Sequence, residues 1–158
     1  MTQPVPDQVK RILFVLTGGA LGDLLLSTPT MEALKRRFPE SSLTCCVNPR
    51  HRPILHGHPC VDGFIELPTD TGLADATREF RNGDFDLAVL AWATSTVAWS
   101  FLLAGIPFRV GRGDRLLYSW TFTHRIRGCH TLSGTHQVEW MLEFAQAVGC
   151  EAEDIRPR

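Results

Sequence analysis

The sequence predicts an α/β protein built on a doubly wound parallel sheet of about five to six strands. Short, nearly continuous apolar runs alternate along the chain with segments in which apolar residues recur every three or four positions. Such runs are typical of parallel strands that helices cover on both faces, and the alternation is typical of a doubly wound sheet. With 158 residues, of which 44% are hydrophobic, the chain can bury about 70% of its unfolded surface in one domain.

The first strand, turn and helix occupy residues 11–39 and contain the leading candidate for a functional residue. Residues 12–16 form an apolar run that predicts a buried strand. Residues 17–22 contain three glycines, which suit a sharp turn and a close approach of the backbone to another group. Asp23 follows at the carboxyl end of this strand, where open α/β sheets bind ligands. Two interpretations of Asp23 are equally good: a helix N-cap and a working carboxylate.

The helix after the turn has two possible starts, because Pro29 lies within its apolar pattern. Asp23 can cap one long helix, in which an interior proline costs about 3 kcal/mol or produces a kink. Alternatively, Thr28 caps a second segment with Pro29 at its first position, where proline is well tolerated. We favour one kinked helix that ends at the basic residues 35–37, whose charges suit the negative end of the helix dipole.

The remaining elements are predicted from the same two patterns. The expected strands span residues 42–47, 63–67, 86–91 and 108–111, and the expected helices span residues 71–81, 94–104 and 135–148, the last with Thr135 as a possible cap. Residues 112–127 are predicted as a short helix or an irregular connection, and residues 1–10, with two prolines and no periodicity, as a loose leader. Right-handed crossovers place the loops after the first, second and fourth strands along one rim.

Composition excludes several classes of function. The net charge of −1 gives no bulk electrostatic support for a nucleic-acid partner, and the apolar stretch 97–105 is too short to span a membrane. The first residues lack the layout of a secretory signal. The five cysteines are odd in number and form no C-x-x-C pair, so we expect the reducing cytoplasm.

The glycine-rich turn resembles two nucleotide-binding motifs only in part. In Gly18-Gly19-x-x-Gly22 the first two glycines are adjacent, and the second strand ends at Asn48 rather than at an acid, so the dinucleotide fingerprint is incomplete. No Gly-Lys-Ser/Thr follows, which excludes a P-loop. What remains is a turn that can present backbone N–H groups to an anion at a helix N-terminus.

Basic and histidine residues supply further candidates. Arg50, His51 and Arg52 follow the second strand on the presumed rim, either as a solvated loop or as a clamp for phosphate or carboxylate groups. The histidines in this loop lack the companions that a metal site needs, so we expect no metal. His136, at the start of the last helix, is interpreted as a surface or capping histidine.

The sequence closely resembles the ADP-heptose:lipopolysaccharide heptosyltransferases, the family 9 glycosyltransferases. The resemblance lies, in order, in the stretches LGDLLLSTPTMEALKRRFPESSLTCCV, HPCVDGFIELP, FDLAVLAW, GIPFRVG and THQVEWMLEFAQAVG. It covers roughly residues 11–150. Its most specific part is the pair Gly22-Asp23, followed six residues later by Pro29.

This resemblance implies a fold and a role for each candidate residue. The fold would be the Rossmann-like, acceptor-binding N-terminal half of a GT-B glycosyltransferase, with residues 151–158 starting the linker to a C-terminal donor domain that is absent. Asp23 would be the catalytic base, and His136 would match the histidine of the family's H-x-V-E stretch, near the cleft. Arg50 and Arg52 would face the Kdo and phosphate groups of the acceptor.

The resemblance also implies a role for the glycine-rich turn, which departs from the family pattern at two positions. Thr17, Gly18, Gly19 and Gly22 would let the acceptor and the donor diphosphate approach the backbone, although Gly18 and Gly19 replace hydroxyl-bearing residues often found there. The resemblance implies ADP-heptose or a similar nucleotide sugar as donor, with no metal or other cofactor.

The implied reaction is inverting transfer of heptose to a hydroxyl of the lipopolysaccharide inner core. Because the family's donor is held mainly by the C-terminal domain, we expect this chain to be inactive alone. We expect a cytoplasmic protein that meets its acceptor at the membrane surface, with peripheral attachment to the inner membrane as an option. Two alternatives stay open: an NAD(P)-type nucleotide-binding oxidoreductase domain and a non-catalytic truncated remnant.

Overall fold

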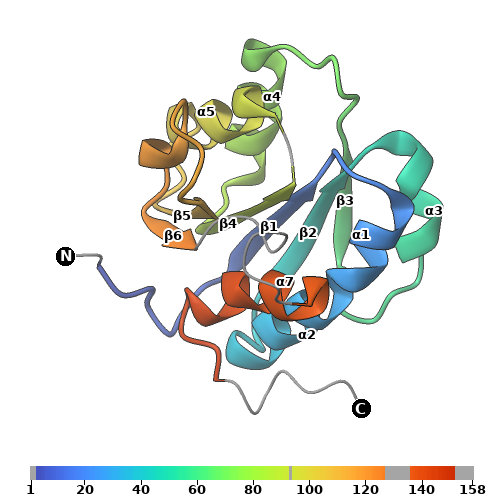
Figure 1. The fold of residues 1–158 in the computed structure, drawn as a ribbon, viewed down its shortest axis with the longest axis vertical. Helices are drawn as coiled ribbons and strands as arrows, with labels where there is room; N and C mark the ends of the chain where they lie inside the picture. Colours follow the sequence, from blue (N-terminus) through green and yellow to red (C-terminus); the bar gives the residue numbers. More distant parts are fainter. Residues whose placement is uncertain (1–2, 93, 127–135, 152–158) are drawn as a thin grey trace.

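The structure, a computed structural model, describes residues 3–92, 94–126 and 136–151, and its centre is a six-stranded, all-parallel sheet (Figure 1). The order of the strands is β3-β2-β1-β4-β5-β6. Their bounds are β1 Arg11–Leu16, β2 Ser42–Val47, β3 Gly63–Glu66, β4 Leu87–Trp92, β5 Phe108–Arg112 and β6 His124–Ile126. The predicted α/β class and parallel sheet are confirmed.

Helices cover both faces of the sheet, as Figure 1 shows. Their bounds are α1 Leu21–Leu26, α2 Thr28–Arg37, α3 Arg52–Leu55, α4 Leu73–Gly83, α5 Ser95–Leu103 and α7 Gln137–Gln146, with single 3-10 turns η1 Pro49–His51 and η2 Ser119–Thr121. Alternate residues of β1 enter two separate cores. Phe14 packs with residues of α2 and α7, whereas Leu13 packs with residues of α4 and α5. The sheet is therefore doubly wound, as the sequence predicts.

The chain changes direction across the sheet between β1 and β4. From β1 it proceeds outward to β2 and β3, and it then returns to β4 and proceeds the other way to β5 and β6. The loops that follow β1 and β4 consequently diverge at the carboxyl edge of the sheet. Such a switch point is where open α/β sheets bind their ligands.

The single kinked helix that we favoured after the turn is wrong. The structure has two segments, α1 and α2, separated by Ser27, which is the N-cap of α2 with Pro29 in the first turn. Ser27 also donates a hydrogen bond from its hydroxyl to the carbonyl oxygen of Leu24, at 2.6 Å. A proline inside a continuous helix cannot donate a backbone hydrogen bond, and its ring clashes with the preceding turn. The helix is therefore interrupted at Ser27, one residue before Thr28, the cap of the second segment in the alternative interpretation.

Two further segments differ in detail from expectation. The irregular connection expected at residues 112–127 contains η2 and the short strand β6, which pairs with β5. In the expected leader, Val5 and Val9 are buried in the core, and Asp7 forms an ion pair with Arg37 at 2.6 Å. The expected cap Thr135 lies outside the described residues, and His136 is the N-cap of α7.

Within the described ranges, no helix is long and apolar enough to cross a membrane.

The turn after β1 generates a stability prediction. A Cβ atom at Gly18 would lie 2.6 Å from Cδ1 of Trp92, whereas a Cβ atom at Gly22 would have no neighbour within 4 Å. We expect Gly18→Ala to lower the free energy of unfolding by about 1–3 kcal/mol, because the indole must move. The matched variant Gly22→Ala should be neutral or stabilising by up to about 1 kcal/mol, since alanine is the better helix former.

Urea denaturation of both variants measures these differences. Equal stability of the two alanine variants would contradict the packing of Gly18 against Trp92.

Candidate functional site

The glycine-rich turn is joined to the end of β4. The backbone N–H groups of Thr17 and Gly18 donate to the carbonyl oxygen of Trp92, at 2.9 and 3.3 Å. Thr17 is buried, and Gly19 adopts a φ of 82°, a conformation that glycine reaches without strain. These contacts hold the turn at the switch point between β1 and β4.

Asp23 lies half-buried in the first turn of α1, at this same edge. Its Oδ2 atom accepts a hydrogen bond from the backbone N–H of Ala20 at 2.7 Å, and its Oδ1 atom accepts one from the side-chain amide of Gln137. The N-cap of α1 is Ala20 rather than Asp23, so Asp23 stabilises the helix start from its third position. Each carboxylate oxygen has a second lone-pair site, so the group can still accept a proton or hydrogen bond from a ligand.

The predicted candidates separate into two groups. Thr17, Gly18, Gly19 and Gly22 lie in the turn that leads into Asp23, and Gly19 lies directly against its carboxylate. A Cβ atom at Gly19 would lie 2.6 Å from Oδ2 of Asp23, so only glycine leaves room for this carboxylate.

His136 reaches the same edge through its neighbour. Its ring Nδ1 accepts a hydrogen bond from the backbone N–H of Val138 at 3.3 Å, which makes it the cap of α7. The next residue, Gln137, is the one that contacts Asp23. The sequence analysis did not single out Gln137, because no local pattern marks a contact with a residue 114 positions away.

Arg50 and Arg52 lie after β2 and form a separate group. Arg52 pairs with Glu66 at 2.8 Å and lies over the ring of Phe64. Arg50 is exposed. In the part of the chain that the structure describes, no hydrogen bond or ion pair joins either arginine to Asp23.

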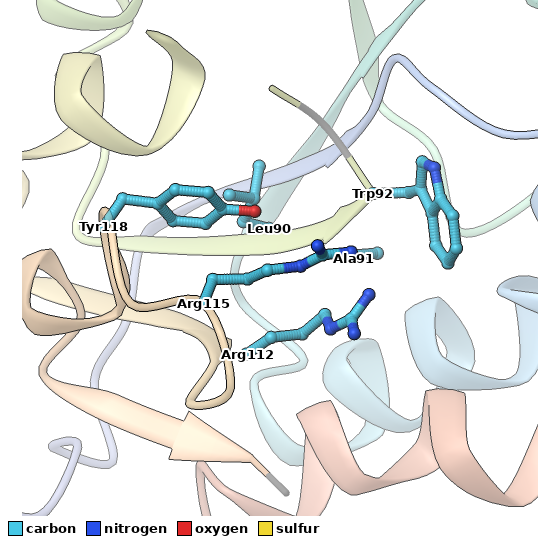
Figure 2. Close-up of a pocket in the computed structure, with 6 residues that line it drawn as sticks. All are labelled: Leu90, Ala91, Trp92, Arg112, Arg115 and Tyr118. Atoms are coloured by element: carbon cyan, nitrogen blue, oxygen red, sulfur yellow. The ribbon is translucent and has the colours of Figure 1, made fainter. Parts of the chain in front are cut away.

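A cluster that the sequence analysis missed lines a pocket at the ends of β4 and β5 (Figure 2). Its lining residues are Leu90, Ala91, Trp92, Arg112, Arg115 and Tyr118. The side chains of Arg112 and Arg115 extend in the same direction, toward Ala91 and Trp92. The signal in the sequence was the pair of arginines in Arg112-Gly113-Asp114-Arg115, directly after a predicted strand.

Arg112 is a buried cation held from three sides. Its Nε and Nη2 atoms donate to the two carboxylate oxygens of Asp114, at 3.0 and 2.7 Å. Its guanidinium carbon lies 5.8 Å from the ring centre of Trp92 and 5.5 Å from that of Trp140. Bidentate pairing and stacking on aromatic faces are the contacts that arginine makes best. The hydrogen bonds from Arg112 lower the pKa of the Asp114 carboxyl.

Two adjacent thiols, those of Cys45 and Cys46, are buried. Burial raises the pKa of Cys45 to about 12 and raises the pKa of Cys46 further, so both act as small apolar side chains. No group of three or more potential metal ligands occurs among the described residues.

Comparison with solved structures identifies the fold. A glycosyltransferase of family 9 from Veillonella parvula superposes with a TM-score of 0.78 at 20% identity, over 92% of this chain and 43% of that one. The chain has the fold of a family 9 glycosyltransferase domain. ADP-heptose lps heptosyltransferase II of E. coli matches with a TM-score of 0.71 at 20% identity, over 94% of this chain and 44% of that one.

A further match extends the same result. E. coli heptosyltransferase WaaC with ADP has a TM-score of 0.72 at 19% identity, over 89% of this chain and 48% of that one. The chain thus spans less than half of the length of these structures, and its fold is that of the N-terminal domain of a GT-B glycosyltransferase. No family model and no curated protein matches the sequence.

The Arg112–Asp114 pair generates a prediction on pH. A carboxyl whose pKa is lower in the folded state stabilises the fold above its unfolded pKa and loses this contribution as the pH falls through the folded value. We expect Asp114→Asn to lower the free energy of unfolding at pH 7 by about 1 kcal/mol or less, because the side chain of Asp114 is one-third exposed. The difference in the free energy of unfolding between this variant and the parent protein should become smaller as the pH falls below about 4.

Denaturation across the pH range measures this difference. Asp75→Asn is the control, since Asp75 and its partner Arg78 are both well exposed. A difference for Asp114→Asn that does not change with pH would contradict the prediction.

Proposed function

We propose that the chain is the N-terminal, acceptor-binding domain of an inverting glycosyltransferase that transfers heptose from ADP-heptose to the lipopolysaccharide inner core. One observation carries the proposal: a carboxylate with a fixed orientation lies at the switch point of a sheet whose fold matches heptosyltransferases. The identities of the sugar and of the acceptor are inferred from the similarity to those proteins.

Asp23 would act as the general base. An acceptor hydroxyl would attack the anomeric carbon of the donor while Asp23 takes its proton, the new glycosidic bond would form, and the bond to the ADP oxygen would break on the opposite face. Proton transfer of this kind contributes about 10²–10⁴ in rate. The hydrogen bonds from Ala20 and Gln137 support this role because they fix where the two carboxylate oxygens lie.

Most of the further lowering of the activation barrier would come from holding donor and acceptor together in the correct orientation. The turn supports this task because Gly19, which lies against the carboxylate of Asp23, has no side chain to cover it. The donor would be held mainly by a second domain, since this chain matches less than half of each of those structures. The leaving diphosphate would be neutralised by basic groups, largely from that domain.

The first test is the variant Asp23→Asn in a full-length context, with a donor-binding domain present. We expect kcat to fall by about 10²–10⁴, while circular dichroism and the Tm stay close to those of the parent, because the asparagine oxygen can still accept from Ala20. Asp75→Asn, an exposed carboxylate on α4, is the control and should keep full activity. Retained transfer by Asp23→Asn would remove Asp23 from the mechanism.

The second test uses the 158-residue chain alone. We expect no release of ADP from ADP-heptose in the presence of acceptor, because this chain spans less than half of the matched transferases. Turnover by the purified chain would overturn this expectation. Titration with NAD(P) separates the oxidoreductase alternative, which requires specific binding of that cofactor.

A further inference from the structure

An apolar patch on the face of the sheet that α4 and α5 cover takes no part in the reaction proposed above. The patch consists of two residues of α5 and three residues of the connection between β5 and β6: Trp99, Leu103, Leu116, Leu117 and Trp120. The rings of Trp99 and Trp120 pack edge to face with their centres 4.7 Å apart, which joins the two segments. Figure 1 shows this connection beside α5.

The leucines of the connection protrude into solvent. Leu116 is 92% exposed, Leu117 is 80% exposed, and Trp120, in the same turn, is 54% exposed. The backbone of the turn is nonetheless fixed, since the N–H group of Ser119 donates to the carbonyl oxygen of Arg115 at 2.7 Å. Side chains with so little contact add almost nothing to the core, and a contiguous exposed apolar patch of this kind is typical of an interaction surface.

The outer face of α5 extends this surface. The helix, Ser95–Leu103, carries no charged residue and is apolar apart from two serines and one threonine. Trp99 and Leu103 are four positions apart, so they lie on the same face of the helix, and Leu103 is 48% exposed. A helix face that meets only water normally carries charged or polar residues, so this face also indicates a missing contact.

Three arginines form a basic rim around the apolar patch: Arg81, Arg109 and Arg125. Arg81 donates to the last carbonyl oxygen of α5 at 2.9 Å, and Arg109 and Arg125 donate to carbonyl oxygens of η2 at 2.6 and 2.9 Å. Among the described residues, none of these three guanidinium groups forms an ion pair. Residues 105–126 contain four arginines and one acid, although the net charge of the whole chain is −1. Positive charge is therefore concentrated around the patch.

We propose that the apolar patch docks on a lipid bilayer whose surface carries anionic headgroups. Leucine and tryptophan side chains enter the interfacial region of a bilayer favourably, and nearby arginines are attracted to anionic lipids. The protruding leucines need no matching cavity in such a partner, because lipid chains rearrange around them. The proposal does not rest on the transferase function.

Charge complementarity favours this occupant over a second copy of the chain. A two-fold contact through the apolar patch would place the same surface on both sides, so that two basic rims would face each other. Like charges that meet at an interface oppose association. An anionic bilayer meets the same rim with the opposite charge.

Co-sedimentation of the 158-residue chain with vesicles tests the proposal. Two kinds of vesicle serve as probes: phosphatidylcholine alone, and phosphatidylcholine mixed with anionic phosphatidylglycerol. We expect stronger binding to the mixed vesicles, and this binding should weaken as the salt concentration rises. The emission of the tryptophans should shift to shorter wavelength on binding, and Trp120→Phe should reduce this shift.

Matched variants separate the patch from the rest of the surface. Leu117→Ser should weaken vesicle binding about tenfold or more, because this side chain no longer leaves water favourably. Leu25→Ser changes an exposed leucine on α1, on the other face of the sheet, and should bind as the parent does. Arg125→Gln should weaken binding to the mixed vesicles about fivefold, whereas Arg36→Gln removes an equal charge from an exposed pair on α2 and should change binding little.

The contrary outcomes are distinct. Absence of binding to the mixed vesicles, or equal binding by Leu117→Ser and Leu25→Ser, overturns the proposal. Equal binding to both kinds of vesicle rejects an anionic surface as the partner. A dimer in size-exclusion chromatography that Leu117→Ser abolishes, without vesicle binding, assigns the patch to a second copy instead. Since no donor or acceptor sugar is present, these results are independent of the Asp23→Asn test.

Discussion

The hydrogen bonds between the turn after β1 and the carbonyl oxygen of Trp92 are the constraint on which the candidate site depends. They join two strands that are neighbours in the sheet but are separated by about half of the chain, and they do so at the point where the following loops diverge. Gly18 makes this approach possible, because any larger residue would collide with the indole. The start of α1, the carboxylate of Asp23 and the pocket under Arg112 are all positioned relative to this junction.

A second constraint is electrostatic. Arg112 is 8% exposed, and the burial of a cation costs less when an opposite charge lies beside it. Asp114 supplies the compensating charge, and the faces of Trp92 and Trp140 supply favourable quadrupoles. This arrangement links the end of β5 to α7 across the rim. It also brings a fixed positive charge to the edge of the sheet at which Asp23 lies, so that both signs of charge are available to a bound ligand.

Much of the fold was predictable because it depends on local patterns. The bounds of β1 to β5 agree with the apolar runs to within two residues, and the position of Asp23 after the first strand follows from the glycines alone. The strand β6 was missed because it has three residues, two of them polar. The break at Ser27 was misjudged because apolar periodicity continues across it, whereas backbone hydrogen bonding does not.

The contacts that complete the site were not predictable from local patterns. The stacking of Arg112 on Trp92 and Trp140 requires the order of the strands, since the three residues come from β4, β5 and α7. The donation from Gln137 to Asp23 likewise requires knowledge that the first and last helices of the described domain meet.

That last contact has a consequence for biosynthesis. The orientation of the carboxylate near the start of the chain is completed by an amide synthesised 114 residues later. In a nascent chain that does not yet contain this amide, Asp23 lacks one of the two donors that hold its carboxylate. Correct geometry at Asp23 therefore requires that translation has continued through α7 and that α7 has docked.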